Sequence, residues 1–328
     1  MSSVVNKQED SWNYTPLPEP IPITEQVWPE GTRPLVCTRH MTYNHENYIR
    51  DCIEGVLMQK TTFPVRVCIH DDASTDKTAE IVREYQEKYP NLIWAYYQEE
   101  NSYRHSKRKE MRSEFSGWVK EGKYQATCEG DDYWIDEFKL EKQASFLDQN
   151  LEYVGCGSNY RSINYKRKDE FIYKKNTLDK YDFFFGGIPK TLTLMYRNID
   201  DSWYYSTIQK LIKTGQTGDR VLSQVLSHYG NIYIFDEFMG VYRHGVGVWS
   251  SNRREENLLN KAKTFSKTSN IIDNKNLKHL CNLSSKKYLL EMEKISNKNI
   301  FKKVFYLIAQ KTIQVYAEFT KKIYRIFD

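Results

Sequence analysis

The sequence contains none of the short signatures that mark several common classes of enzyme and membrane protein. Its six cysteines form no CxxC pair and no Cys/His zinc spacing, so we expect buried thiols in a reducing compartment rather than a zinc finger. No GxSxG motif is present, which excludes the hydrolases built on that turn. No run of about 18 apolar residues occurs, so we predict no membrane-spanning helix. The first residues lack a basic region followed by an apolar core, and we therefore expect no signal peptide and a cytoplasmic protein.

The charge of the chain also excludes one class of partner. The 328 residues carry 48 Lys and Arg against 43 Asp and Glu, a net charge of +5. This mild excess lacks the concentrated footprint of a nucleic-acid-binding protein, so we expect no nucleic-acid partner. The excess is local, because residues 257–328 are rich in Lys and poor in acids. The 25 Tyr and 15 Phe mostly fill the core, although aromatic side chains also line sites for flat or sugar-like ligands.

The order of the predicted elements indicates an α/β fold. Residues 1–33 contain five prolines and suit an extended arm. Strands and helices then alternate: we predict strands at 35–41, 65–70, 91–97 and 124–128, and helices at 46–59, 75–89 and 106–121. This alternation predicts a mostly parallel sheet with helices on both faces. Ligands bind such sheets outside the carboxyl ends of the strands.

Polar, largely acidic loops follow three of these strands. The first strand is followed by TYNH at 42–45, the second by DDASTD at 71–76, and the fourth by EGDDYW at 129–134. Carboxylates that meet at one sheet edge repel one another unless a cation joins them, and Mg²⁺ or Mn²⁺ is the natural candidate. No Walker loop and no GxGxxG follows any strand, so the metal would be the main neutraliser of substrate phosphates.

These motifs, taken together and in this order, resemble those of a known family. The segments 34–85 and 122–147, with TYN, DDASTDKT and EGDDYW, are similar to family 2 of the inverting glycosyltransferases. The similarity extends over about residues 23–250, and the subgroup is bacterial and acts on cell-surface polysaccharide or lipopolysaccharide. The resemblance implies the GT-A fold, a Rossmann-like, mostly parallel central sheet flanked by helices. The implied layout is an arm (1–33), a GT-A domain (34–250) with a nucleotide-sugar-binding half (34–138) and an acceptor-binding half (139–250), and a C-terminal helical extension (251–328).

The resemblance also implies roles for individual residues. It places the nucleotide-sugar contacts on Thr42, Tyr43, Asn44, Asp71, Asp72, Ser74, Asp131 and Arg243. It places the metal ligands on Glu129, Asp131, Asp132 and His244. Glu129 stands where the family has an Asp, and which of Asp131 and Asp132 holds the metal stays open. Arg243 and His244 fall in a YRHGVGVWS segment that is one residue shorter than the family's spacing, so the division of roles between them stays open too.

Asp219 is the residue that the resemblance implies as the general base. It lies in TGDR, before a helical run, where one carboxylate can take the proton of the attacking acceptor hydroxyl. The alternative is a helix N-cap, which a TGD turn also suits. On the acceptor side the resemblance points to Thr191 and Thr193, whose alternative is an ordinary turn and strand, and to Trp249, whose alternative is burial.

The implied reaction is the inverting transfer of a sugar from a nucleotide-diphosphate donor, with UDP the favoured nucleotide. The acceptor would be a saccharide or a lipid-linked saccharide. Two alternatives stay open: a metal-dependent nucleotidyltransferase or phosphohydrolase acting on nucleotide sugars, and a non-catalytic sugar-binding scaffold. The absence of a Gly-rich loop after the first strand argues against a nucleotidyltransferase. The intact TGD and EGDD stretches argue against the scaffold.

The last stretch predicts a basic amphipathic helix. Its apolar residues recur at steps of three and four, with lysines between them: Phe301, Val304, Phe305, Ile308, Val315, Tyr316, Phe319, Ile323 and Phe327. The favoured reading is that this helix packs on the catalytic domain or on a second subunit of a homo-oligomer. The other reading is that residues 300–328 lie on an anionic membrane, at the inner face of the plasma membrane, where a lipid-linked acceptor would be found.

Overall fold

The computed structural model describes residues 13–102, 113–164, 168–184, 189–212, 218–246, 254–270, 272, 274–296 and 300–327. Its contacts divide the chain into two compact units. Unit 1 comprises residues 1–177, 189–199 and 232–246, and unit 2 comprises 178–188, 200–231 and 247–328. Each unit is described by itself below. The domain bounds implied by the family resemblance remain predictions.

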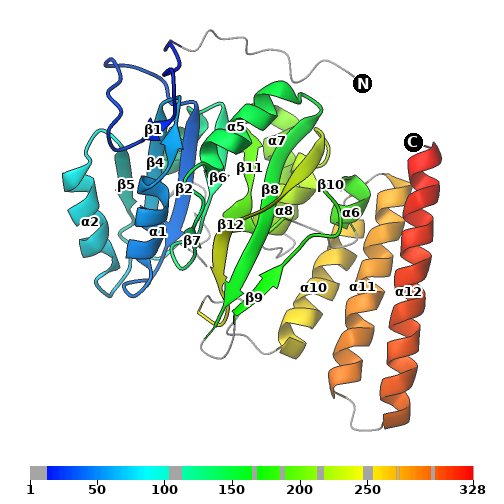
Figure 1. Cartoon of the computed structure of the whole chain (residues 1–328). Helices are drawn as coiled ribbons and strands as arrows, with labels where there is room; N and C mark the ends of the chain where they lie inside the picture. Colours follow the sequence, from blue (N-terminus) through cyan, green and yellow to red (C-terminus); the bar gives the residue numbers. More distant parts are fainter. Residues whose placement is uncertain are drawn as a thin grey trace. The chain divides into compact units, whose positions relative to one another are not determined.

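Unit 1 is built on a sheet whose first half is parallel (Figure 1). Its strands are β2 (Val36–Thr42), β4 (Val65–Asp71), β5 (Ile93–Tyr97) and β6 (Tyr124–Thr127). β2 pairs in parallel with β4 and with β6, and β4 pairs in parallel with β5. The register sets Thr42 opposite Asp71, and Arg39 opposite Thr127. The three carboxyl ends therefore meet at one edge, as the sequence predicts.

The sheet continues with antiparallel strands, so as a whole it is mixed. β11 (Met195–Arg197) pairs antiparallel with β6 and with β8 (Tyr153–Ile163). The path then runs through β12 (Asn231–Arg243) to β10 (Thr177–Leu178), while β7 (Tyr133–Trp134) pairs with β12 and β9 (Lys168–Phe171) with β8. A separate two-stranded sheet joins β1 (Ile21–Pro22) of the N-terminal arm to β3 (Lys60–Thr61). The described part of the arm, residues 13–33, contains no helix.

Helices bury both faces of the parallel half. α1 (Ile49–Leu57), α2 (Thr78–Lys88) and α5 (Lys139–Gln149) contribute to the larger core, where the apolar residues of α1 are buried: Ile49, Ile53, Val56 and Leu57. α4 (Ser113–Lys120) supplies Phe115 and Val119 to a second cluster with Cys37 and Cys68. Alternate residues of β2 enter different clusters, Val36 the first and Cys37 the second, as expected for a strand buried on both sides. All six cysteines are buried and unbridged.

Unit 2 is helical in its described residues. It contains α6 (Lys180–Phe184), α7 (Ser202–Ile212), α8 (Gly218–Leu226), α10 (Arg254–Ser269), α11 (Lys275–Ser296) and α12 (Ile300–Phe327), and the last three lie side by side in Figure 1. Their core gathers Tyr181, Leu258, Ala262, Phe265, Leu280, Cys281, Leu283, Tyr288 and Ala317. Lys321 of α12 is buried and pairs with Asp182 of α6 at 3.2 Å. The predicted helical character of the last stretch is confirmed. Among the described helices, none is long and apolar enough to cross a membrane.

Candidate active site

The acidic loop after β6 is the centre of the candidate site. Glu129, Asp131 and Asp132 each offer a carboxylate oxygen, and these oxygens all lie within 4.8 Å of one another. The backbone N–H of Gly130 donates to the carbonyl of Met41 at 2.9 Å, and that of Asp132 donates to the carbonyl of Glu129 at 3.0 Å. These bonds fold the loop back over the end of β2. Asp131 and Asp132 are buried, whereas Glu129 is exposed.

The loop concentrates negative charge in a poorly solvated place. Burial and the neighbouring Asp131 raise the pKa of Asp132 well above its usual range, and a hydrogen bond from the backbone N–H of Arg243 at 2.8 Å opposes that rise. Charged carboxylates in this arrangement gain from a divalent cation, and a set made of oxygen donors alone suits Mg²⁺ or Mn²⁺. The residues present therefore fit the predicted metal. His244 is not part of this group: its backbone N–H donates to the carbonyl of Ile163 at 2.8 Å, and its ring lies against Tyr242.

The two aspartates that follow β4 differ in their surroundings. Asp72 is held in place, because its Oδ1 accepts bonds from the N–H and the hydroxyl of Ser102 at 2.9 and 2.6 Å. Asp71 Oδ2 accepts the N–H of Ser74 at 3.0 Å, but its Oδ1 is buried and has no hydrogen-bond partner in the described parts of the chain. Burial is also the main reason that the pKa of Asp71 is raised. Asp71 thus presents the free acceptor that a ligand N–H or hydroxyl could use.

The loops after β2 and β4 hold each other in shape. Asn44 and Ala73 both adopt positive φ angles, 55° and 62°, which side-chain-bearing residues rarely do. The N–H of Asn44 donates to Ser74 Oγ at 2.9 Å, and Asn44 Oδ1 accepts the N–H of Thr75 at 2.8 Å. Asn44 and Ser74 therefore use these polar atoms in hydrogen bonds between the two loops. The neighbouring Tyr43 keeps 40 % of its surface exposed, which leaves its ring free to stack on a flat ligand.

Gly130 lets the acidic loop approach β2 closely. A Cβ atom at this position would lie 2.7 Å from Thr42 Oγ1 and 2.9 Å from His45 Nδ1. These two side chains are themselves in contact, with Thr42 Oγ1 and His45 Nδ1 3.2 Å apart. Thr42 is buried, so the structure gives it the role of a packing partner for the loop.

Arg243 holds the acidic loop from the other side. Besides the bond of its N–H to Asp132, its Nη1 donates to the carbonyl of Asp131 at 2.9 Å, and its Nη2 pairs with Asp51 of α1. The guanidinium carbon lies 5.2 Å from the ring centre of Tyr48 and 4.4 Å from that of Tyr133. Arg243 is therefore a clamp between β12, the loop and α1.

Sequence reasoning missed several of these partners. Asp51 and Tyr48 flank Arg243 but belong to no motif, and Tyr133 flanks it from within EGDDYW without a predicted role. Lys190 lies with its Nζ 3.2 Å from the ring centre of Tyr242, and its positive charge acts to lower the pKa of Asp132. No local pattern would identify Lys190, because its relation to the loop depends on the pairing of distant strands.

The other predicted residues have these positions. Asp219 lies in the first turn of α8, in unit 2, and its Oδ1 accepts the N–H of the next residue, Arg220, at 2.8 Å; an N-cap would accept an N–H two or three residues on. Thr191 and Thr193 form a short 3₁₀ turn, η1 (Thr191–Thr193), where Thr193 is fully buried and its hydroxyl donates to the carbonyl of Lys190. Trp249 and Thr217 lie outside the described residues, as does the predicted helix before Ser113.

Comparison with known proteins assigns the domain. The family model described as glycosyl transferase family 2 matches residues 41–190, which include both acidic motifs. These residues form a family 2 glycosyltransferase domain. TuaG of Bacillus subtilis strain 168, provisionally assigned as a teichuronic acid biosynthesis glycosyltransferase, is 30 % identical over 164 residues, which cover 50 % of this chain and 62 % of TuaG.

Two further comparisons show how much of the chain is similar to known proteins. An uncharacterised protein of Mycobacterium tuberculosis strain H37Rv is 43 % identical over 116 residues, 35 % of this chain, and the match spans only 32 % of that protein. The crystal structure of S. aureus TarS 1–349 in complex with UDP-GlcNAc superposes with a TM-score of 0.52 at 18 % identity, covering 79 % of this chain and 71 % of that one. The expected GT-A fold is thereby confirmed.

A second cluster lies directly beneath the acidic loop of the family 2 domain. His40, Cys52 and Cys128 are all buried, with possible ligand atoms within 4.8 Å of one another. Both ring nitrogens of His40 already have partners, Thr38 Oγ1 at 2.8 Å and the carbonyl of Cys128 at 3.1 Å. Cys52 Sγ lies 3.5 Å from the carbonyl of Glu129. We interpret the cluster as hydrogen-bonded packing that supports the loop.

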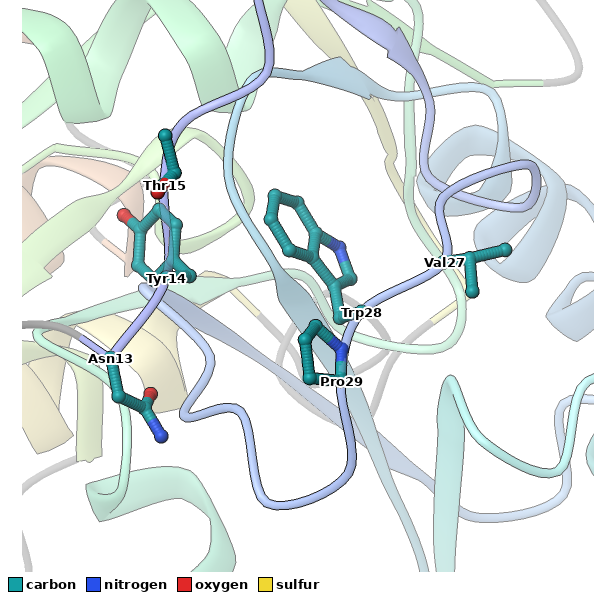
Figure 2. A pocket seen from close by; sticks show the side chains of 6 residues that line it. All are labelled: Asn13, Tyr14, Thr15, Val27, Trp28 and Pro29. Carbon is teal, nitrogen blue, oxygen red and sulfur yellow. The ribbon is translucent and has the colours of Figure 1, made fainter.

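Unit 1 also has a hollow in its N-terminal arm, outside the residues that the family model matches. Figure 2 shows the residues that line it: Asn13, Tyr14, Thr15, Val27, Trp28 and Pro29. Tyr14 and Trp28 meet edge to face, with ring centres 5.5 Å apart. The described lining residues include no carboxylate, thiol or imidazole, so they do not supply the groups that the chemistry of the acidic loop requires.

Proposed function

We propose that this chain is an inverting glycosyltransferase that moves a sugar from a nucleotide-diphosphate donor to a saccharide or lipid-linked saccharide in cell-surface polysaccharide biosynthesis. The observation that carries the proposal is the joint position of the three-carboxylate loop and Asp71 at one edge of a family 2 domain. Hexosyl transfer and a UDP-linked donor are part of the proposal. The fold shared with TarS, whose crystal structure contains UDP-GlcNAc, supports that choice of nucleotide.

On the donor side, unit 1 offers complementary groups. Asp71 Oδ1 would accept a hydrogen bond from the base or the ribose, because it is buried and otherwise unpaired. Tyr43 would stack on the base, and Thr42, Asn44, Asp72 and Ser74 would hold the two loops in the binding geometry. Asp71 and Tyr43 would thus contact the nucleotide, while the residues around them, which are already hydrogen-bonded, would fix their positions.

The predicted metal would be held by Glu129, Asp131 and Asp132. A bound Mg²⁺ or Mn²⁺ would neutralise the diphosphate and stabilise it as a leaving group. Arg243 would keep Asp131 and Asp132 in place and add positive charge near the phosphates. His244 stays a proposed neighbour of the diphosphate.

Transfer requires one base and no covalent enzyme intermediate. The oxygen of the acceptor hydroxyl bonds to the anomeric carbon as the bond from that carbon to the diphosphate oxygen breaks, and the nucleotide diphosphate departs with the bonding electrons. We assign the hydroxyl proton to the carboxylate of Asp219. Thr191, Thr193 and Trp249 stay proposed on the acceptor side, with Thr193 acting through the backbone turn because its hydroxyl is buried.

Thermal unfolding with a panel of nucleotide sugars tests the donor and the metal. We expect a UDP-sugar with Mn²⁺ or Mg²⁺ to raise the melting temperature. Asp132→Asn should abolish the metal-dependent part of this rise, whereas Asp169→Asn on the exposed strand β9 should retain it. Absence of stabilisation by every nucleotide diphosphate, with either metal, would refute the proposal. Donor cleavage without transfer to any saccharide would favour the phosphohydrolase alternative.

We also propose that α12 contacts an anionic membrane. One face of the helix is packed, with Ala317, Thr320 and Lys321 buried. The opposite face carries an apolar stripe, which we call the α12 stripe, in which 50–70 % of each side chain is exposed: Ile308, Val315, Tyr316 and Phe319. Lys311 and Lys322 are exposed on the same side. Lysines beside an apolar stripe can reach lipid phosphates while the stripe is buried, whereas a second copy would oppose lysine to lysine.

Vesicle binding tests this second proposal. We expect co-sedimentation with vesicles of phosphatidylglycerol and phosphatidylcholine, and little with phosphatidylcholine alone. The double variant Val315→Ser/Phe319→Ser should lose binding, while Val27→Ser, at a 91 % exposed position of the arm, should keep it. Equal binding by the double variant would show that the α12 stripe is not the membrane contact. Loss of a dimer in that variant would instead assign the stripe to a second copy.

A further inference from the structure

Two buried polar side chains on α8 lack partners. Only 7 % of Arg220 and 3 % of Gln224 are exposed. The Nη1 of Arg220 and both amide atoms of Gln224 make no hydrogen bond in the described parts of the chain. The two residues are four positions apart on the helix and so lie on the same face. A guanidinium cannot shed its charge, so Arg220 remains a buried cation with an unused donor.

Other cations gather at the same place. The guanidinium carbon of Arg220 lies 4.7 Å from the ring centre of Phe265, which stacks on Tyr288 at 5.8 Å. The Nζ atoms of Lys261 and Lys287 lie 5.5 and 5.4 Å from the ring centre of Tyr288. Burial is the main reason that the pKa of both lysines is lowered, and repulsion from Arg220 adds to it. Three cations from three helices therefore surround one aromatic pair.

The acidic side chains that act on these cations, Glu291, Asp219 and Glu318, each have a partner in the described residues. Glu291 Oε1 accepts a bond from Arg254 at 3.0 Å and its Oε2 accepts one from Gln310 at 3.3 Å. Asp219 uses Oδ1 on the N–H of Arg220. Lys321, which also acts on Lys287, is paired with Asp182. What stays unsatisfied in the described residues is the Nη1 of Arg220 and both amide atoms of Gln224, and an anion with a hydroxyl beside it would satisfy them.

We propose that unit 2 contains an anion-binding site formed by Arg220, Gln224, Lys261 and Lys287, and that it takes the phosphate or carboxylate group of a hydroxyl-bearing ligand. Arg220 Nη1 and Gln224 Nε2 would donate to the anion. Gln224 Oε1 needs a donor, which a neighbouring hydroxyl of the same ligand would supply. An acidic saccharide combines both features.

The position of the site suggests what the ligand is. Arg220 follows Asp219 directly in α8, so the anion would bind next to the residue assigned as general base. We infer that the acceptor is a saccharide carrying phosphate or carboxylate. This second step rests on the proposed transferase function, whereas anion binding itself does not.

Thermal unfolding of the full chain in EDTA tests the site without the metal. With inorganic phosphate in place of chloride at equal ionic strength, we expect the melting temperature of the native protein to rise by about 2–4 °C at tenfold excess over Kd. Arg220→Met and Gln224→Glu should both lose this response. Gln224→Glu should in addition raise the melting temperature without phosphate, because it places a carboxylate beside Arg220. Lys263→Met, at an exposed position of α10, should respond as the native protein does.

The outcomes separate the site from the proposed function. No response of the native protein to phosphate, or a lower melting temperature for Gln224→Glu, overturns the anion site even if Arg220→Met fails to fold. If the site binds the acceptor, phosphate will raise the KM for acceptor and leave the KM for nucleotide sugar unchanged. A phosphate response with unaltered acceptor KM overturns the acceptor assignment alone. A phosphate response with no transferase activity leaves the site standing and removes the proposed function.

Discussion

Gly130 is a position of the candidate site where there is no space for a larger side chain. Because a Cβ there would meet Thr42 and His45 at less than 3.0 Å, Gly130→Ala should displace the acidic loop and lower the free energy of unfolding by about 1–3 kcal/mol. Metal-dependent stabilisation by a nucleotide sugar should be lost. Gly117→Ala is the matched control, since Gly117 is an exposed residue of α4 where a Cβ meets nothing within 4 Å, and it should raise stability by ~1 kcal/mol. Urea unfolding measures both changes.

Lys139 carries a buried positive charge that forms no ion pair with a carboxylate in the described parts of the chain. Its side chain is fully buried, its Nζ donates to Gln143 Oε1 at 2.5 Å, and it lies 4.2 Å from the ring centre of Trp134. Burial lowers the pKa of Lys139 from 10.5 to about 8. At 1.36 kcal/mol per pKa unit, the charged form costs ~3 kcal/mol in the folded state.

The pH dependence of stability tests this. Between pH 8 and 10.5 the unfolded chain binds the proton of Lys139 and the folded chain does not, so the contribution of this residue to stability rises with pH. Lys139→Met removes that contribution. The free energy of unfolding of the native protein minus that of Lys139→Met should therefore increase from pH 7.5 to pH 10. Lys142→Met, a partly exposed lysine of the same helix, should show no such trend, and a flat difference for Lys139→Met would contradict the assignment.

Asp219 admits a test that separates catalysis from capping. Asp219→Asn keeps an oxygen that can accept the N–H of Arg220 but cannot take a proton from the acceptor. We expect an unchanged melting temperature, unchanged donor binding, and a fall in kcat of about 10²-fold or more. A fully active Asp219→Asn would leave the cap as the function of this residue.

The place of a residue in the candidate site could be predicted only where the residue belongs to a local motif. Asp131 and Asp132 stand in EGDDYW directly after a strand, so their place at the sheet edge follows from the fold. The difference between Asp71 and Asp72 does not, because it depends on Ser102, some thirty residues away. No sequence motif marked Lys190 either, because its relation to the acidic loop also depends on distant parts of the chain.

At the scale of elements, the pattern of apolar residues predicted the strands and helices better than their ends. α1 begins at Ile49 and not at residue 46, and the N–H groups of the preceding His45 and Glu46 donate to Thr78 at the start of α2 and to Asp76 in the loop before it. α2 begins at Thr78, where Asp76 Oδ1 accepts the N–H of Thr78 at 2.9 Å. Hydrogen bonds between loops produce no periodic pattern in the sequence, so the ends of these helices could not be predicted from it.

The end of β12 offers a prediction about an element rather than an isolated residue. Arg243→Lys retains the charge but cannot contact both the carbonyl of Asp131 and the carboxylate of Asp51. We expect the Kd for a nucleotide sugar with metal to rise about tenfold, with a smaller change in melting temperature. Arg161→Lys, on the exposed part of β8, is the control and should bind as the native protein does. Calorimetric titration measures both, and equal affinities would show that the clamp does not support the donor site.

α12 shows why a periodic pattern does not define a surface. Its apolar residues occupy two faces, one buried around Ala317 and the other exposed around Val315. The sequence predicted an amphipathic helix, which is confirmed, but periodicity alone cannot say which apolar residues find a partner within the chain. The sequence therefore could not identify which residues of the helix are left exposed for a membrane or a second copy.

At the scale of the whole molecule, the sequence separated an acidic catalytic region from a basic tail. The structure gives that contrast a more specific form. Negative charge collects on one loop of unit 1, and positive charge collects both on α12 and around the aromatic pair of unit 2. The second of these could not be predicted, because Arg220, Lys261 and Lys287 come from three separate helices. Lys261 and Lys287 belong to no motif, and Arg220 stands in TGDR without a predicted role of its own.

The clamp at Arg243 also has a consequence for how the protein is made. Arg243 is 111 residues from Asp132 and 192 from Asp51, the two side chains that it bonds. During synthesis at about 5–20 residues per second, roughly 5–20 s pass between the appearance of the acidic loop and that of the arginine that fixes it. A chain that stops before residue 243 thus contains both acidic motifs without an assembled site. The residue that fixes the acidic loop is thus added at the end of β12, after every other strand of the described sheet has been synthesised.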